Sequence, residues 1–294
     1  MSFLRRLFKS AYRKVPLKQT AYTVLSRIVK LPKRIYQHLH FEGFFEVEAA
    51  PGRSFQVYHH GAIEENEIFW NGLYNGWERQ SMVLWSQLVP EAKVILDVGA
   101  NTGIYGLVAE TINPKASVHC FEPIRGVFKI LQNNFRRNHF RAKLYEFGLS
   151  NYTGYAKIYL AKGDDFAYSV TVNKNTLTVE ADEITIRVKT LRDFISAAKL
   201  QSIDLMKIDV ESHEPEVLEG MGRYLVAFQP TILIEVLDEV SGKKLTDMFA
   251  GMGYLYFNID DNRGTVRQTT VITKSDNWNY LVCKPDVARR LRII

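Results

Sequence analysis

The chain has 294 residues, of which 46% are hydrophobic and 24% are charged. These fractions are typical of a globular protein and exclude a collagen-like or wholly disordered chain. The length predicts one or two domains, each large enough to fold without disulfide bonds. The two cysteines, Cys120 and Cys283, lie within apolar runs, so we expect reduced, buried thiols and no structural zinc site.

The net charge of +6 is concentrated at the N-terminus. Residues 1–40 contain ten lysines and arginines and no acid, which leaves 28 basic and 32 acidic residues in 41–294, a net charge of −4. We therefore expect a basic, largely helical N-terminal arm over residues 1–68 and a separate folded domain over residues 69–294. Because the excess of basic residues lies outside that domain, a nucleic-acid partner is disfavoured.

Apolar residues of the arm recur at helical steps between basic residues. The pattern runs from Leu4 to Val15, closes at Pro16, and repeats from Tyr22 through Leu25 and Ile28 to Val29. Such a segment is typical of helices on anionic membranes, so we expect residues 1–40 to contact a membrane surface; a helix docked on the protein is the alternative. The sequence has neither an 18-residue apolar run nor a signal-peptide pattern, which predicts a cytoplasmic protein, peripheral at the inner face of the membrane.

Strand and helix patterns alternate from about residue 90 onward. Short apolar runs predict strands at 94–98, 116–121, 143–147, 205–210, 231–235, 255–259 and 280–283. Helical spacing predicts helices at 104–112, 127–138 and 216–225. Alternating residues predict antiparallel strands in an insert at 154–190. This order indicates an α/β fold, a doubly wound, mostly parallel, seven-stranded Rossmann-like sheet with a small antiparallel insert.

A glycine-rich turn, Asp97-Val-Gly-Ala-Asn-Thr-Gly103, joins the first strand to the first helix. Such a turn binds nucleotides in doubly wound sheets, but the nicotinamide fingerprint needs a second glycine where this chain has Asn101. No lysine or arginine lies between Val94 and Pro114 to meet a phosphate. Glu122 ends the second strand, where a carboxylate accepts hydrogen bonds from a ribose diol. The turn therefore favours S-adenosylmethionine, which carries a cationic sulfonium and no phosphate, over a dinucleotide.

Charged residues follow the fourth strand in Lys207-Ile-Asp-Val-Glu-Ser-His-Glu214. Strand alternation places Lys207, Asp209 and Glu211 on one face, at the edge of the sheet where ligands bind. Methyl transfer to a hydroxyl requires a base, and His213 is the first candidate because its ordinary pKa is near neutral.

Further acids lie near this edge. Asp209 is expected to position the cofactor or the base, and the other catalytic candidates are Glu211, Glu214 and Glu235. A magnesium site built from Asp209, Glu211, His213 and Glu235 is disfavoured by the charge of Lys207, so we expect no metal.

Three segments, Asp97–Gly103, Phe121-Glu-Pro123 and Lys207–Glu214, together resemble the FkbM-type S-adenosylmethionine-dependent methyltransferases. The resemblance covers about Trp70 to Pro285 and extends to Leu218-Glu-Gly220, Val188–Asp193 and Asn279-Tyr-Leu281. Ser212 departs from it, since the family usually has glycine there. The cofactor contacts that the resemblance implies are Asp97, Gly99, Asn101, Thr102 and Gly103 at the methionine end, Glu122 and Pro123 at the ribose, Gly148 and Leu149 near the adenine, and Asp209, with Glu78 in the lead-in segment as a further candidate.

The resemblance implies an O-methyltransferase that acts on a hydroxyl of a sugar, in a surface glycan or glycolipid, or of a natural product. A nucleic-acid methyltransferase that uses the basic arm and a non-catalytic cofactor-binding module are the alternatives, and Asn101 disfavours a nicotinamide oxidoreductase. Acceptor contacts are expected from the insert, at Asp164, Asp165, Tyr168 and Ser169.

Overall fold

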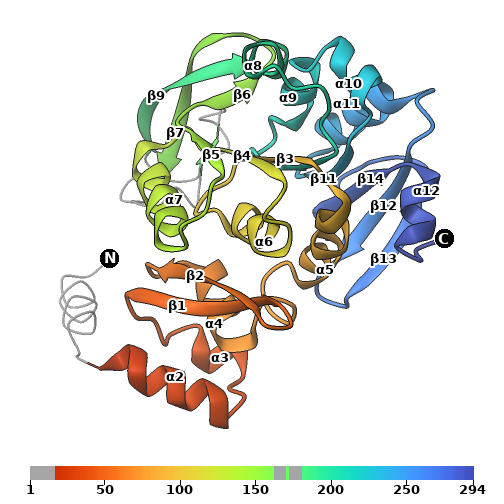
Figure 1. Ribbon diagram of the computed structural model, residues 1–294. Coiled ribbons are helices and arrows are strands. Elements are labelled where there is room, and N and C mark those ends of the chain that lie inside the picture. Colours follow the sequence, from red (N-terminus) through yellow and green to blue (C-terminus); the bar gives the residue numbers. More distant parts are fainter. Residues whose placement is uncertain (1–16, 162–169, 172–180) are drawn as a thin grey trace. The chain divides into compact units, whose positions relative to one another are not determined.

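The computed structural model describes residues 17–161, 170–171 and 181–294 (Figure 1). The chain divides into two compact units, Met1–Arg79 and Gln80–Ile294. The helix expected over residues 4–15 and the acceptor candidates at 164–169 lie outside the described residues. None of the helices in the described ranges has both the length and the apolar character needed to cross a bilayer.

The described part of the first unit, from residue 17 onward, contains an antiparallel hairpin and three helices. Its elements are α2 (Lys18–Ile28), α3 (Lys33–Tyr36), β1 (Gly43–Ala50), β2 (Arg53–His59) and α4 (Ile63–Asn71). The hairpin was not among the expected elements, although Phe45, Val47 and Ala49 alternate as buried residues along β1. In the ladder Phe45 lies opposite Val57.

The second unit is built on an eight-stranded sheet with the order β13-β12-β14-β11-β10-β3-β4-β5. Its strands are β3 (Val94–Val98), β4 (Ser117–Phe121), β5 (Lys143–Tyr145), β10 (Leu205–Ile208), β11 (Thr231–Glu235), β12 (Leu255–Asp260), β13 (Thr265–Thr269) and β14 (Asn279–Cys283). The five strands from β11 to β5 are parallel, and β14, β12 and β13 extend the sheet antiparallel. The expected α/β class with a doubly wound, mostly parallel sheet is confirmed; β13 was missed.

A smaller sheet with the order β6-β9-β7-β8 holds the insert. Its strands are β6 (Gly148–Ser150), β7 (Gly154–Ala161), β8 (Val170–Thr171) and β9 (Ala181–Thr190). The expected antiparallel pair in the insert is confirmed by β7 and β9. The third strand of the main sheet, expected to reach Phe147, ends at Tyr145, because the chain then turns to pair β6 with β9.

Helices accompany the strands, and they are more numerous than the helices expected near 104–112, 127–138 and 216–225. They are α5 (Arg79–Leu88), the 3-10 helix η1 (Val89–Glu91), α6 (Ile104–Ile112), α7 (Arg125–Arg137), α8 (Leu191–Ala198), α9 (Glu214–Glu219), α10 (Arg223–Phe228), α11 (Glu239–Phe249) and α12 (Pro285–Arg290). The single helix expected over 216–225 is wrong, because Gly222, at φ 57°, separates α9 from α10.

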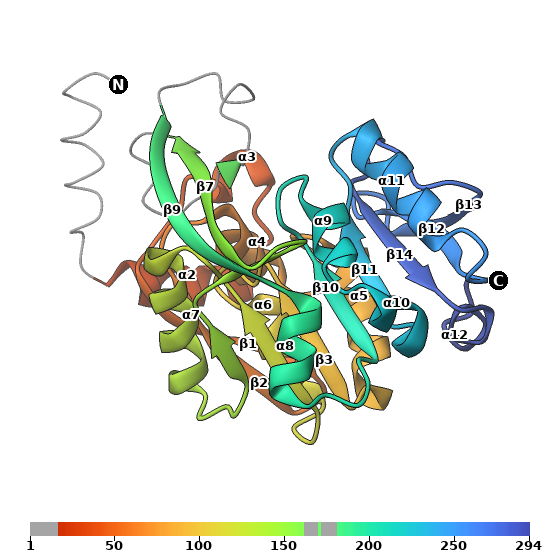
Figure 2. The same cartoon turned by 90° about the horizontal axis from the view of Figure 1, so that it is seen from above.

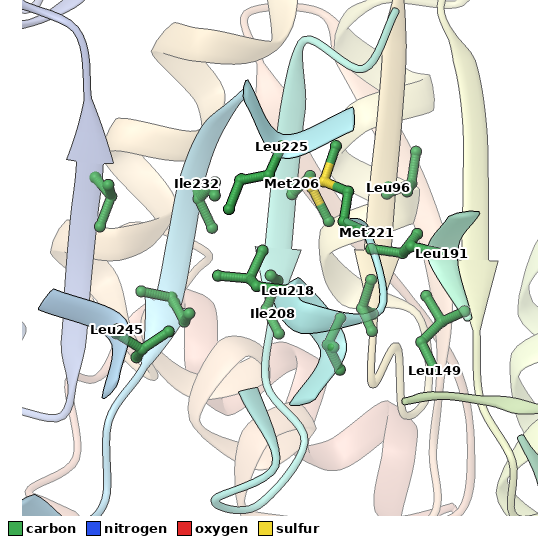
Figure 3. Packing of buried hydrophobic residues seen from close by; sticks show 14 of the residues in the cluster. Leu96, Leu149, Leu191, Met206, Ile208, Leu218, Met221, Leu225, Ile232 and Leu245 are labelled. Atoms are coloured by element: carbon green, nitrogen blue, oxygen red, sulfur yellow. The ribbon is translucent and has the colours of Figure 1, made fainter. Parts of the chain in front are cut away.

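One face of the main sheet packs against α8 to α11. Figure 3 shows Leu96, Met206, Ile208 and Ile232 of neighbouring strands among helix residues such as Leu218 of α9. The helix α6 lies against the opposite face, where Gly106 approaches the Cys120 and Asp97 side chains. Figure 2 shows helices on both sides of the parallel strands, which buries both faces of this part of the sheet.

Candidate functional site

The turn between β3 and α6 packs closely against the loop after β10. Gly99 has φ 79°, its amide donates to Phe121 O at 3.0 Å, and a Cβ there would overlap the carbonyl oxygen of Asp209. Gly103 has φ 96°, and a Cβ there would lie 2.5 Å from Leu131 Cδ1 of α7. Glycine is required at both positions, so this turn presents bare backbone at the carboxyl end of the sheet.

Glu122 is tied to the same turn. It is 5% exposed, and its Oε2 accepts from the amide of Asn101 at 3.1 Å, while Oε1 accepts from the amide of Ile124 at 2.8 Å. Asn101 adopts a left-handed conformation, φ 47°, which directs this amide at the carboxylate. Burial raises the pKa of Glu122 to about 7, and the two amide donors oppose that rise. The ends of β3 and β4 are thus joined through one carboxylate.

Asp97 lies at the end of β3 and is 1% exposed. Its Oδ2 accepts from the amide of Gly106 at 3.0 Å, which anchors α6 to the strand. In the parallel ladder Asp97 lies beside Lys207 of β10. Burial raises the pKa of Asp97 to about 7, against the lowering effects of Gly106 and Lys207.

The remaining cofactor candidates lie in four different segments of the chain. Thr102 is buried in the turn, and Pro123 is half-buried just after β4. Gly148 and Leu149 are buried in β6, which belongs to the smaller sheet. Glu78 belongs to the first unit and has φ 43°. Their roles stay predictions.

Lys207 is a buried cation at the centre of a polar relay. It is 1% exposed, and its Nζ donates to Asp209 Oδ2 at 3.0 Å and to Asn279 Oδ1 at 3.3 Å. The Tyr105 ring lies below the ammonium, 5.2 Å away at its centroid. Asn279 Nδ2 donates in turn to Asp261 Oδ2 at 3.2 Å. A buried ammonium that is satisfied in this way holds the Asp209 carboxylate in a fixed position.

The relay ends at the N-terminus of α5. Asp261 Oδ1 accepts from the amides of Gln80 and Ser81, both at 2.8 Å, and Oδ2 accepts from Ser81 Oγ at 2.9 Å. The sequence analysis did not single out Asp261. Asn279 was noted only as part of a segment that resembles the family. Neither residue follows the carboxyl end of a parallel strand next to the glycine-rich turn, so the order of the strands did not point to them.

The acids after β10 lie in a loop and do not continue the strand. The expectation that alternation places Glu211 on the face of Lys207 is wrong, because β10 ends at Ile208, and Glu211 and Ser212 have φ of 58° and 69°. The pKa of Glu211 is raised to about 7 by burial and by the charge of Asp209. The Ser212 hydroxyl hydrogen-bonds Asp238, a contact that glycine would lack.

Glu214 closes this loop from within the protein. It is fully buried, and its Oε1 accepts from the amide of Val210 at 3.0 Å. Its Oε2 has no hydrogen-bond partner among the residues that the structure describes. Burial raises the pKa of Glu214 to about 8, although the amide of Val210 lowers it. Glu214 is therefore mostly protonated at neutral pH and can act as a neutral hydrogen-bonding group.

His213 faces β6 and α9. Its Nε2 lies 3.0 Å from Ser150 Oγ, and its Nδ1 lies 3.6 Å from a carboxylate oxygen of Glu216. Burial lowers the pKa of His213, while the charges of Glu216 and Glu219 act in the opposite direction. The ring is thus neutral at neutral pH, with a carboxylate beside Nδ1 to stabilise a bound proton.

Glu235 ends β11 with 8% exposure, opposite Asn279 in the antiparallel ladder with β14. Within residues 17–161, 170–171 and 181–294, no three side chains of His, Cys, Asp or Glu converge as metal ligands would. In this part of the chain Asp209 binds the Lys207 ammonium.

The sequence profile of the methyltransferase FkbM domain matches residues 97–256. That range begins at Asp97 and includes both the glycine-rich turn and the loop after β10. A crystal structure of methyltransferase FkbM from Methylobacillus flagellatus KT is 17% identical, with a TM-score of 0.43 over 65% of this chain and 43% of that chain.

Several characterised proteins are similar over part of the chain. The 2-O-methyltransferase NoeI of Sinorhizobium fredii is 32% identical over 43% of this chain and 56% of its own length. The hexuronic acid methyltransferase AglP of Haloferax volcanii is 26% identical over 54% and 62%. The AMB antimetabolite synthetase AmbE of Pseudomonas aeruginosa is 27% identical over 76% of this chain and 12% of its own length. The matches thus span less than two thirds of each of these relatives.

Proposed function

Because the chain belongs to the methyltransferase FkbM family, we propose that it transfers a methyl group from S-adenosyl-L-methionine to a hydroxyl oxygen of a sugar or a natural product. The proposal rests on one observation. The amide of Asn101 in the glycine-rich turn donates a hydrogen bond to the buried carboxylate of Glu122 at the end of β4. The similar proteins NoeI, AglP and the 31-O-demethyl-FK506 methyltransferase FkbM support this class of acceptor by their names.

The side chains at this edge of the sheet fit the cofactor. S-adenosylmethionine supplies an electrophilic methyl group on a cationic sulfur. Asp97, Asp209 and Glu122 provide negative charge near the turn, and the interval between Val94 and Pro114 contains no lysine or arginine. Each oxygen of Glu122 accepts one amide hydrogen bond and keeps a lone pair for a ribose hydroxyl.

Asp209 is assigned a positioning role at the cofactor. Lys207 binds Oδ2, which leaves Oδ1 to accept a hydrogen bond from the amino group of the methionine part. Relaxation of this carboxylate into other rotamers is opposed by the relay through Asn279. Because the carboxylate is already fixed in orientation, binding of the cofactor has a smaller entropic cost.

His213 is proposed as the general base. Its Nε2, the nitrogen that contacts Ser150 Oγ, accepts the proton of the acceptor hydroxyl as the methyl group is transferred. Glu216 near Nδ1 then stabilises the protonated ring. Burial lowers the pKa of His213, which favours the neutral ring that can accept a proton. Glu211, Glu214 and Glu235 remain candidates for acceptor contacts.

The test combines transfer with binding. The full chain is incubated with methyl-labelled S-adenosylmethionine and an extract of glycolipids, glycans and metabolites, and we expect label on an alcohol oxygen. The variant His213→Ala should bind the cofactor and transfer no label, whereas the exposed-histidine control His38→Ala should behave as the wild type. Label on a nucleic acid alone would contradict the proposed function. Full transfer by His213→Ala would contradict the assignment of His213 as the base.

A further inference from the structure

Exposed apolar residues lie along α2, the red-orange helix of Figure 1. Ala21, Val24 and Ile28 follow one another at steps of three and four residues, which places them in one line along the helix, and Leu17 is the N-cap residue just before it. Leu17 is 78% exposed, Val24 is 53% exposed and Ile28 is 74% exposed. We call these four residues the α2 stripe.

The opposite side of α2 holds the helix on its own unit. Gln19 Nε2 donates to Phe44 O at 2.5 Å, and the ring of Tyr22 packs 5.7 Å from that of Trp70. The sequence analysis had placed Tyr22 with Ile28 on one apolar face, whereas the structure separates them. Amphipathic helices of globular proteins bury their apolar side, so α2 is turned the other way.

Exposed basic residues lie near the α2 stripe in the sequence. Arg27, Lys30 and Arg34 are exposed, and residues 1–41 contain no acid. Ile35 of α3 adds another exposed apolar side chain, at 43%. Exposed apolar residues bordered by cations are the composition that interfacial helices use on anionic lipid.

We propose that the α2 stripe docks on an anionic membrane surface, with Val24 and Ile28 entering the headgroup region and Arg27 and Lys30 binding lipid phosphates. A nucleic acid would satisfy the cations but leave the apolar line exposed. A second copy of this chain would bring the exposed cations Arg27, Lys30 and Arg34 of two chains together. The stripe lies outside the matched FkbM domain, and the inference goes beyond the proposed methyl transfer.

The test compares two exposed apolar residues. The full chain is mixed with vesicles of phosphatidylcholine, with and without phosphatidylglycerol, and bound protein is measured by sedimentation. Ile28→Asp should weaken binding to the anionic vesicles about tenfold. Val240→Asp on α11, with a 67% exposed valine and the same change of charge, should leave binding unchanged.

Each other outcome overturns the proposal. Equal binding by Ile28→Asp and the wild type would show that the stripe does not meet the membrane. Loss of a dimer in Ile28→Asp would assign the stripe to a second copy, and stronger binding to RNA than to vesicles would assign the basic face to nucleic acid. A lower unfolding temperature for Ile28→Asp than for Val240→Asp would show that the stripe packs on the chain itself.

Discussion

Replacement of Lys207 by methionine tests the relay that holds Asp209. The ammonium is 1% exposed and lies 3.0 Å from Asp209 Oδ2 and 3.3 Å from Asn279 Oδ1. Methionine has a similar length and no charge, so it fills the same space. Loss of a hydrogen bond to a charged group costs about 1.5–3 kcal/mol. We therefore expect affinity for S-adenosylmethionine to fall about 10- to 100-fold, since each 1.4 kcal/mol is about tenfold.

The same substitution changes the pH dependence. Lys207 lowers the pKa of Asp97, which burial has raised to about 7, so removal of the cation raises that pKa further. A carboxyl group that must be ionised for cofactor binding then loses its proton only at a higher pH. The acidic limb of cofactor binding should move upward by about one pH unit.

Calorimetric titration with the cofactor, from about pH 5 to about pH 9, measures both effects. Lys157→Met is the matched control, because Lys157 pairs with Glu183 at 2.8 Å on the surface and lies outside the relay. Thermal unfolding verifies that both variants are folded. If the Lys207→Met chain is folded and has wild-type affinity and an unshifted pH profile, the relay does not position Asp209 for cofactor binding.

Three further substitutions test the site. His213→Ala should lose turnover and keep cofactor affinity, measured by labelled transfer and calorimetry. Burial raises the pKa of Glu214 from 4.5 to about 8, so the folded chain keeps a proton that the unfolded chain releases, and stability falls as pH rises between these values. Glu214→Gln should make that fall smaller in urea unfolding, and the remainder comes from Asp97, Glu122 and Glu211, whose pKa values burial raises to about 7. Gly99→Ala should cost more than about 3 kcal/mol, because its Cβ meets Asp209, whereas Gly251→Ala, which meets no atom within 4 Å, should cost about 1 kcal/mol.

The strands and helices beside the turn were predictable, because each is encoded by neighbouring residues. The run Val94–Val98 became β3, and the helix expected over 104–112 became α6 with the same bounds. The alternation of Phe45, Val47 and Ala49 also indicates a strand in the first unit. It was missed because these residues were assigned to the basic, largely helical arm expected over residues 1–68.

The arrangement of the site was less predictable, since it depends on residues far apart in the chain. The direction of His213 is set by Ser150, 63 residues earlier, and Lys207 is satisfied by Asn279, 72 residues later. The sequence indicated only that the charge of Lys207 disfavours a metal ion, and the structure adds that Lys207 is the partner of Asp209. Local periodicity could not show that β10 stops before Glu211.

The most direct test of the account is competitive calorimetry on the full chain with S-adenosylmethionine, S-adenosylhomocysteine and a nicotinamide dinucleotide. The account predicts that both sulfur nucleosides bind at one site, that Glu122→Ala weakens both, and that the dinucleotide does not bind. Tight binding of the dinucleotide, with no heat from either sulfur nucleoside, would contradict it.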